Sequence, residues 1–303
     1  MCLLGRLSRA GYYRHWRSSA PREENTALCD RLQQLALAHR HYGYRRLGVL
    51  LRREGWDVNH KRVLRLMRAD NLLCLRRRAF VPPTTDSKHS WPVWPNLARG
   101  IKTTGLNQLW VADITYVRLK EEFVYVAVVL DAHSRRVVGW AIERYLGTVL
   151  ALRALRMALT ERRPEPGMIH HSDRGVQYAC FDYVKMLQEQ GIQISMSRVG
   201  NPYDNAKAES FMKTLKQEEV DGREYRDANH LRRSIAEFLE NVYNRQRLHS
   251  ALGYQSPSEF EEALLSAGIS TRMCGGRVLP PPSPTPPTPA ISEYFVPIFA
   301  VSG

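Results

Sequence analysis

The 303-residue chain has few cysteines, and no two of them lie close together in the sequence. The five are scattered along the chain, odd in number and without a C-x-x-C spacing. They are Cys2, Cys29, Cys74, Cys180 and Cys274. This pattern argues against a disulfide framework and against a cysteine-based zinc site. It is typical of a reducing compartment, so we expect a cytoplasmic protein.

Long hydrophobic runs are also missing, and acidic residues are in deficit. No apolar stretch reaches the length of a membrane span, and the apolar core of the start, MCLLGRLSRAGYYRHW, is too short for a secretory signal. A hydrophobic content of 44% excludes global disorder. Lys and Arg number 44 against 30 Asp and Glu, a formal net charge of +14. That excess favours a polyanionic partner such as nucleic acid, although a basic protein without one fits the charge equally well.

Residues 26–79 predict a small all-α module. Leucines recur at helical spacing first, a second helix is expected between Gly43 and Gly55, and Asn59 can cap a third. The short break before the third helix is typical of a helix-turn-helix. The basic start of that helix predicts DNA contact, and the alternative is a helical hairpin with a charged outer face. The predicted contact residues are His60, Lys61, Arg62 and Arg65.

The rest of the chain predicts a linker, a catalytic-sized domain and a tail. Prolines and tryptophans indicate a linker at 80–104, after an N-terminal segment 1–25 and the helical module. In the domain at 105–262, the apolar run 123–130 predicts a central strand buried on both faces. Residues 263–303 are Pro-rich, and we expect disorder there. Strands are expected at 109–119, 122–134, 135–143, 167–173 and 192–197, and helices at 148–162, 181–190, 205–219 and 227–243. The first three strands predict an antiparallel meander in an α/β mixed sheet flanked by helices.

Three acidic residues stand out by their positions. Asp113 lies inside an apolar strand, Asp173 ends the strand at 167–173, and Glu209 lies early in a helix. A carboxylate in such a strand is costly unless it is paired or binds a cation, and metal-assisted phosphoryl transfer uses such groups. Spacing alone does not select this set, because Asp182 and Glu218 lie as far apart along the chain as Asp173 and Glu209. That other pair lies in polar helical stretches, where we expect a solvated surface.

Dense motifs surround the three carboxylates. They are VADITYV with Asp113, HHSDRGVQY with Asp173 and GNPYDNAKAESFMKTLK with Glu209. With these motifs, and with YNRQRLHSALGYQSPSEF near the end and LSRAGYYRHW at the start, the sequence resembles the insertion-sequence transposases of the family numbered three. The resemblance is closest to their second-reading-frame (OrfB) catalytic subunit and covers nearly all of residues 1–262. The Pro-rich tail departs from the family pattern.

The resemblance implies an RNase H-like fold in which Asp113, Asp173 and Glu209 form a catalytic, metal-binding triad. The implied cofactor is Mg²⁺ or Mn²⁺, as two ions, with Asp113 bridging both. The paired His and Cys of a zinc module are missing around His39 and His41, so we predict no zinc. The implied chemistry is nicking at the element's ends, followed by attack of the freed 3′-hydroxyl on another DNA phosphate.

The resemblance also implies partners and a location. The partners are double-stranded DNA at the element's ends and at the target, further copies of this chain on that DNA, and an upstream first-frame helix-turn-helix protein that ribosomal frameshifting can fuse to this chain. The resemblance implies no membrane partner, and it implies a protein of the bacterial cytoplasm that is associated with the nucleoid. A non-catalytic DNA-binding repressor and an RNase H-like nuclease that cuts without joining remain alternative functions.

Several further residues admit two interpretations. Lys213 and Lys216 share the helical face of Glu209 and either contact phosphate or form a solvated face. His171 either assists substrate positioning or is packed in the core. Asn205 or Asp204 is expected to cap the Glu209 helix. A last cluster, for which DNA contact and plain surface charge are balanced, consists of Arg245, Arg247 and His249.

Overall fold

The computed structural model describes residues 23–73, 92–120, 122–198 and 202–273. The chain divides into two units, residues 1–263 and residues 264–303. The expectations for residues 1–22, for the first half of the linker and for the Pro-rich run after residue 273 lie outside these ranges. No helix within the ranges is both long enough and apolar enough to cross a membrane.

Three helices form the predicted helical module: α2 (Glu23–Ala38), α3 (Tyr44–Arg53) and α4 (His60–Ala69). Leucines at helical spacing on α2 and α3, with Val63 and Met67 of α4, form its buried core. The Asn59 side chain accepts a hydrogen bond from the backbone N–H of Lys61 (2.8 Å), which confirms the predicted cap. Gly55, at φ +88°, permits the turn between α3 and α4 because it has no Cβ.

A five-stranded mixed sheet forms the centre of the second part. Its strands are β1 (Leu109–Arg118), β2 (Phe123–Asp131), β3 (Val137–Glu143), β4 (Ile169–Ser172) and β5 (Gln193–Met196). They lie in the order β3-β2-β1-β4-β5. The first three are antiparallel, which confirms the meander, and β4 and β5 are parallel to β1. From Val124 onwards β2 is almost wholly buried, as predicted, but the middle strand of the sheet is β1.

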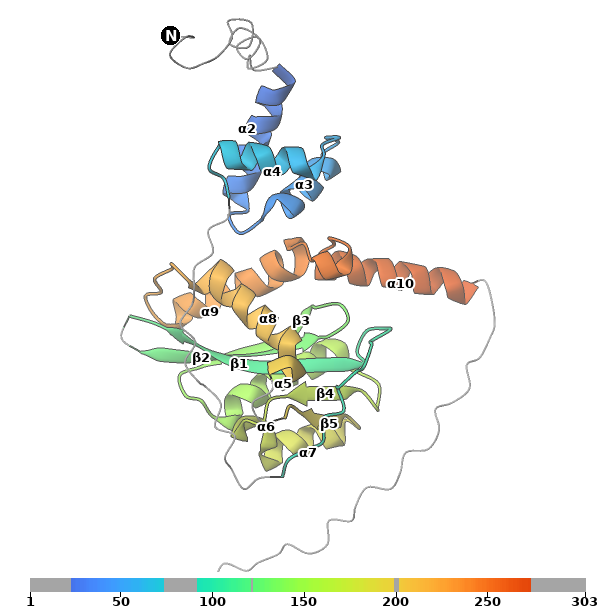
Figure 1. Ribbon diagram of the computed structural model, residues 1–303. Coiled ribbons are helices and arrows are strands. Elements are labelled where there is room, and N and C mark those ends of the chain that lie inside the picture. The colour runs from blue at the N-terminus through green and yellow to red at the C-terminus, as the bar shows by residue number, and fades with distance from the viewer. Residues whose placement is uncertain (1–22, 74–91, 121, 199–201, 274–303) are drawn as a thin grey trace, which may run out of the picture. The chain divides into compact units, whose positions relative to one another are not determined.

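Helices cover both faces of this sheet (Figure 1). On one face lie α5 (Thr148–Arg162), α6 (Val176–Ala179) and α7 (Phe181–Glu189); on the other lie α8 (Ala206–Leu215) and α9 (Ala228–Glu237). Alternate residues of β1 serve the two cores, since Trp110 packs in the α5 layer and Val111 in the α8 layer. Gly139 allows α5 to approach β3 closely, because a Cβ at that position would overlap the carbonyl oxygen of Ala154.

The helical elements near the C-terminal end differ in three ways from the prediction. The π-helical segments η2 (Lys216–Val220) and η3 (Phe238–Gln246) continue α8 and α9. Two short 3₁₀ turns, η1 (Pro202–Asn205) and η4 (Ser250–Leu252), were not predicted either. Helix α10 (Pro257–Met273) extends beyond residue 262, where we expected the core to end. Its sequence is helix-compatible, and the glycine- and proline-rich run begins only after it.

Candidate active site

Asp113 and Asp173 lie where the parallel neighbours β1 and β4 part. The pairing of β1 with β4 covers only Leu109–Val111 against Ile169–His171. Asp113 is two residues beyond the end of that pairing, and Asp173 directly follows the last residue of β4. In open α/β sheets, ligands bind in the crevice outside the carboxyl ends of neighbouring strands. The topology therefore brings these two carboxylates to the edge at which such a crevice forms.

Helix α8 brings the third carboxylate to the same region. It packs on β1, and Glu209 lies in its first turn with an exposed side chain. The residue before the helix, Asn205, donates a hydrogen bond from Nδ2 to the carbonyl oxygen of Ala112 (3.0 Å). The predicted capping by Asn205 is therefore wrong, because its side chain binds β1 instead of the helix start. Asp204 forms an ion pair with Arg198 (Nε to Oδ2, 3.1 Å).

The three carboxylates influence one another electrostatically. Burial, the charge of Asp173 and the charge of Glu209 together raise the pKa of Asp113 to about 8, although the Ile114 N–H donates to its Oδ1 (2.9 Å). Burial also raises the pKa of Glu209. Lys216 acts in the opposite direction on Asp113, and its Nζ lies 4.6 Å from the centre of the Tyr116 ring. Burial and the charges of Asp173 and Glu209 thus disfavour the ionised form of Asp113.

The chemistry of these donors fits a hard divalent cation. Carboxylate oxygens are the ligands that Mg²⁺ and Mn²⁺ prefer, and a cation would offset the burial and the neighbouring charges that raise the pKa of Asp113. Asp173 is already oriented, since its Oδ1 accepts a hydrogen bond from the Gly175 N–H (2.9 Å). A closed cage is not preformed: in the described part of the chain, no three His, Cys, Asp or Glu side chains converge tightly enough to hold an ion.

The predicted basic residues occupy two separate places. Lys213 is exposed on α8, and Lys216 is half-buried at the start of η2. The other set is at the N-terminal end of α4, where Arg62 is half-buried. The exposed members there are His60, Lys61 and Arg65. The structure therefore keeps the two lysines with the carboxylates and the second set with the helical module.

His171 is buried and packed on both sides. Its Nδ1 lies 2.8 Å from the Ser195 hydroxyl and its Nε2 lies 3.0 Å from the Ser197 hydroxyl. Burial lowers its pKa to about 4, so the ring is neutral at pH 7. Since both ring nitrogens already have protein partners, the geometry favours the packing interpretation over a role in positioning substrate.

Two residues that we expected at the surface are buried. Arg247 pairs with Glu218, and His249 is half-buried beside it, with its pKa lowered to about 3 by burial and by the charge of Arg247. The solvated surface predicted for Glu218 is therefore wrong, as is the surface position that both interpretations gave to Arg247. Sequence reasoning also missed the contact of Asn205 with β1. Its only signal was a polar residue directly before a helix, which is the usual sign of a cap.

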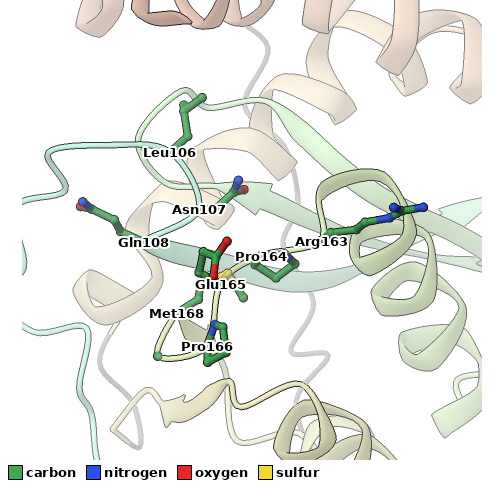
Figure 2. Close-up of a pocket in the computed structure, with 9 residues that line it drawn as sticks. Leu106, Asn107, Gln108, Arg163, Pro164, Glu165, Pro166 and Met168 are labelled. Atoms are coloured by element: carbon green, nitrogen blue, oxygen red, sulfur yellow. The ribbon is translucent and has the colours of Figure 1, made fainter. Parts of the chain in front are cut away.

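A pocket of about 440 Å³ lies at the other end of β1 and β4 (Figure 2). It is lined by Leu106–Gln108, which precede β1, and by residues 163–168, which precede β4. Asp113 lies beyond the β1–β4 pairing and Asp173 directly follows β4, and none of the three acids lines the pocket, so it is separate from them. Its lining includes one arginine, one glutamate and two prolines.

Comparison with known protein families defines the class of protein. Residues 104–202 and residues 190–257 each match the integrase core domain, and residues 23–80 match the HTH-like domain. The strand order and the helices on both faces agree with the RNase H-like fold that we predicted. The chain is thus an integrase-type core that follows a helix-turn-helix-like module.

Relatives over most of the chain identify the family. An uncharacterized 31 kDa protein of insertion element IS600 from Shigella sonnei is 40% identical over 268 residues, which are 86% of this chain and 97% of that protein. The transposase for IS904 from Lactococcus lactis is 36% identical (82% and 98% covered), and the transposase InsF for IS3A from Escherichia coli K12 is 37% identical (88% and 94% covered). The chain belongs to this family of insertion-sequence transposases.

Solved structures of viral integrases are more distant. A simian T-cell lymphotropic virus intasome, in complex with a PP2A regulatory subunit, aligns with a TM-score of 0.44 at 15% identity, covering 86% of this chain and 80% of that one. The HTLV-2 integrase catalytic core in complex with magnesium aligns with a TM-score of 0.39 at 13% identity, covering 51% and 96%. At these scores the likenesses support no conclusion about this chain.

Proposed function

We propose that this chain catalyses both chemical steps of transposition: it cleaves DNA at the ends of its insertion sequence and joins the freed 3′-hydroxyls to target DNA. The observation that supports the proposal is that Asp173 and Glu209 both act electrostatically on the buried Asp113, beyond the point where β1 and β4 part, in a chain of the transposase family. Each of the three comes from a different element, so only the folded sheet and helix α8 bring them together.

The carboxylates of Asp113, Asp173 and Glu209 would together hold two Mg²⁺ or Mn²⁺ ions. When bound, such ions neutralise phosphate charge and favour ionisation of the attacking hydroxyl. The Gly175 N–H keeps the Asp173 carboxylate in a fixed orientation. The side chain of Glu209 is exposed, so it can swing towards the other two when DNA and metal arrive.

Both steps are displacements at phosphorus. In the first, the oxygen of water forms a bond to phosphorus and the bond to the 3′-oxygen breaks, so that oxygen leaves with a proton as a 3′-hydroxyl. In the second, that hydroxyl gives its proton to solvent, its oxygen bonds to a target phosphorus, and the target's own 3′-oxygen leaves and takes up a proton. One phosphorus–oxygen bond forms and one breaks each time, so no energy-rich cofactor is required.

DNA would be held by positive side chains at both places described above. Lys213 projects from α8 near the triad, and Lys216 is close enough to Asp113 to influence its charge. The exposed basic start of α4 would contact the duplex, as in other helix-turn-helix proteins. Several copies of the chain would act together, because the two ends of one element must be cut and joined in concert.

A strand-transfer assay tests the proposal. A labelled duplex that carries an element end is incubated with the chain, with the upstream first-frame protein present, in Mg²⁺, in Mn²⁺ or in EDTA. We expect nicked and joined products with either metal and none in EDTA. Binding without cleavage in all conditions would instead indicate a repressor, and cleavage without joining a nuclease.

A further inference from the structure

The side chain of Asn205 bridges the helix that carries Glu209 and the strand that carries Asp113. Its Nδ2 donates to the carbonyl oxygen of Ala112 (3.0 Å), the residue directly before Asp113. Asn205 itself directly precedes α8, and it is only 6% exposed. One hydrogen bond therefore joins the two elements beside two of the proposed metal ligands.

The Ala112 carbonyl lies just past the end of the β1–β4 pairing. Leu109 O accepts from Ala132 N on the β2 side (2.9 Å), whereas Gln108 O accepts from Ile169 N on the β4 side (3.0 Å). Even-numbered residues of β1 thus direct their backbone groups towards β4, and Ala112 is the first of them beyond the last pair, Val111 with His171. A buried carbonyl needs a donor, and there a side-chain amide supplies it.

This contact determines how α8 lies along β1. Glu209 follows Asn205 by four residues and lies in the first turn of α8, so a shift of the helix start moves Glu209 with it. A slip of one residue would move Glu209 by about 1.5 Å along the helix axis and rotate it by about 100°. Such a slip is large for a catalytic group, because misplacement by about 1 Å can cost on the order of 100-fold in rate.

The amide of Asn205 is only half satisfied by this contact. Asn205 Oδ1 is buried and has no hydrogen-bond partner among the residues that the structure describes. Burying the other half of an amide without a partner costs free energy, and the hydrogen bond to the Ala112 carbonyl offsets that cost. The single bond to Ala112, which sets the position of α8, is what the amide provides in return.

We propose that Asn205 is a positioning residue that aligns Glu209 with Asp113 for metal binding. The proposal rests on the proposed function, because it assumes that these carboxylates bind metal. The neutral amide fixes the spacing of two acids without adding a third charge between them. Removing it should weaken metal binding and slow the chemistry while the DNA-binding surfaces stay unchanged.

The test compares Asn205→Ala and the near-isosteric Asn205→Leu with Asn244→Ala. Asn244 is a matched control: it is also 6% exposed and bonds strand backbone, with Nδ2 to Val137 O and Val137 N to Oδ1, both at 3.0 Å. Each variant is assayed for Mn²⁺ affinity by calorimetry, DNA affinity in EDTA, joining rate at saturating DNA, and cooperative thermal melting. Mn²⁺ affinity can be measured whether or not joining occurs.

We expect both Asn205 variants to melt cooperatively, to bind DNA within about twofold of wild type, to bind Mn²⁺ at least about fivefold more weakly and to join DNA on the order of 100-fold more slowly. Wild-type Mn²⁺ affinity in either variant would overturn the proposal. So would an equal loss of Mn²⁺ affinity in Asn244→Ala, or loss of cooperative melting in both Asn205 variants, since folding would then explain the residue. If wild type binds Mn²⁺ but never joins DNA, the proposed function fails alone.

Discussion

Glu218 and Arg247 form a buried, bidentate ion pair, with Nη2 2.8 Å from Oε1 and Nε 3.0 Å from Oε2. Their side chains are only 12% and 8% exposed. The pair joins η2, which continues the Glu209 helix, to the segment that follows η3. The next residue, Leu248, is buried in the core of the helical module, and its N–H donates to the Tyr42 hydroxyl (2.9 Å). The ion pair therefore lies between the helix that carries Glu209 and the helical module.

Glu218→Gln should destabilise the protein. It leaves the Arg247 guanidinium buried without a counter-ion, and breaking a buried pair in this way costs roughly 3–5 kcal/mol. Urea denaturation measures the free energy of unfolding. Glu189→Gln is the control, because it breaks the exposed Lys185–Glu189 pair and should cost less than about 0.5 kcal/mol. Similar losses in both variants would show that the burial of the pair has no energetic consequence.

Asp113→Asn, Asp173→Asn and Glu209→Gln should each abolish cleavage and joining. Each change removes a charge from the proposed metal site, and we expect a loss of at least about 100-fold in rate with DNA binding retained. Gel assays of nicked and joined DNA, together with binding isotherms, measure the two effects separately.

Asp182→Asn is the control for these three variants, since Asp182 is exposed on α7. Glu218 lies as far from Asp182 along the chain as Glu209 lies from Asp173. Glu218→Gln is nevertheless unsuitable as a second control, because it disturbs the buried pair with Arg247. If Asp182→Asn loses as much activity as the three variants, the assignment of the carboxylates is wrong.

Lys213→Ala and Lys216→Ala should weaken DNA binding without regard to sequence. Each lost phosphate contact lowers the slope of log affinity against log salt by about one. Titrations at several salt concentrations give the slope, and Lys185→Ala, an exposed lysine of α7, serves as the control. An unchanged slope in both variants would mean that these lysines form a solvated face.

This chain alone should show little preference for the element's ends. A single small module buries limited surface on DNA and reads few bases, so phosphate contacts should dominate. Addition of the upstream first-frame protein, or fusion to it, should create the preference. Competition between end-containing and scrambled duplexes at physiological salt measures it. A large preference shown by this chain alone would assign end recognition to residues 26–79.

Local patterns in the sequence were enough to predict most helices and strands, and they singled out three acids whose catalytic role stays a prediction. The alternation and apolar runs of the first three strands predicted the meander, and Asn59 predicted the start of α4. An acid inside an apolar strand indicated Asp113. These signals are local. A hydrophobic period of two or 3.6 residues, a helix-capping residue, or a charged residue in an apolar strand can be recognised within a few residues.

Only the tertiary structure decided the roles of the polar residues with distant partners. The polar sequence around Glu218 predicted a solvated acid. Glu218 is buried instead, because Arg247 reaches it from another element. Asn205 stands directly before a helix, as a capping residue does, but its side chain donates a hydrogen bond to the strand that carries Asp113. The physical reason is the same in both cases. A polar group can leave water only where a partner satisfies it, and chain topology, rather than neighbouring sequence, brings that partner into reach.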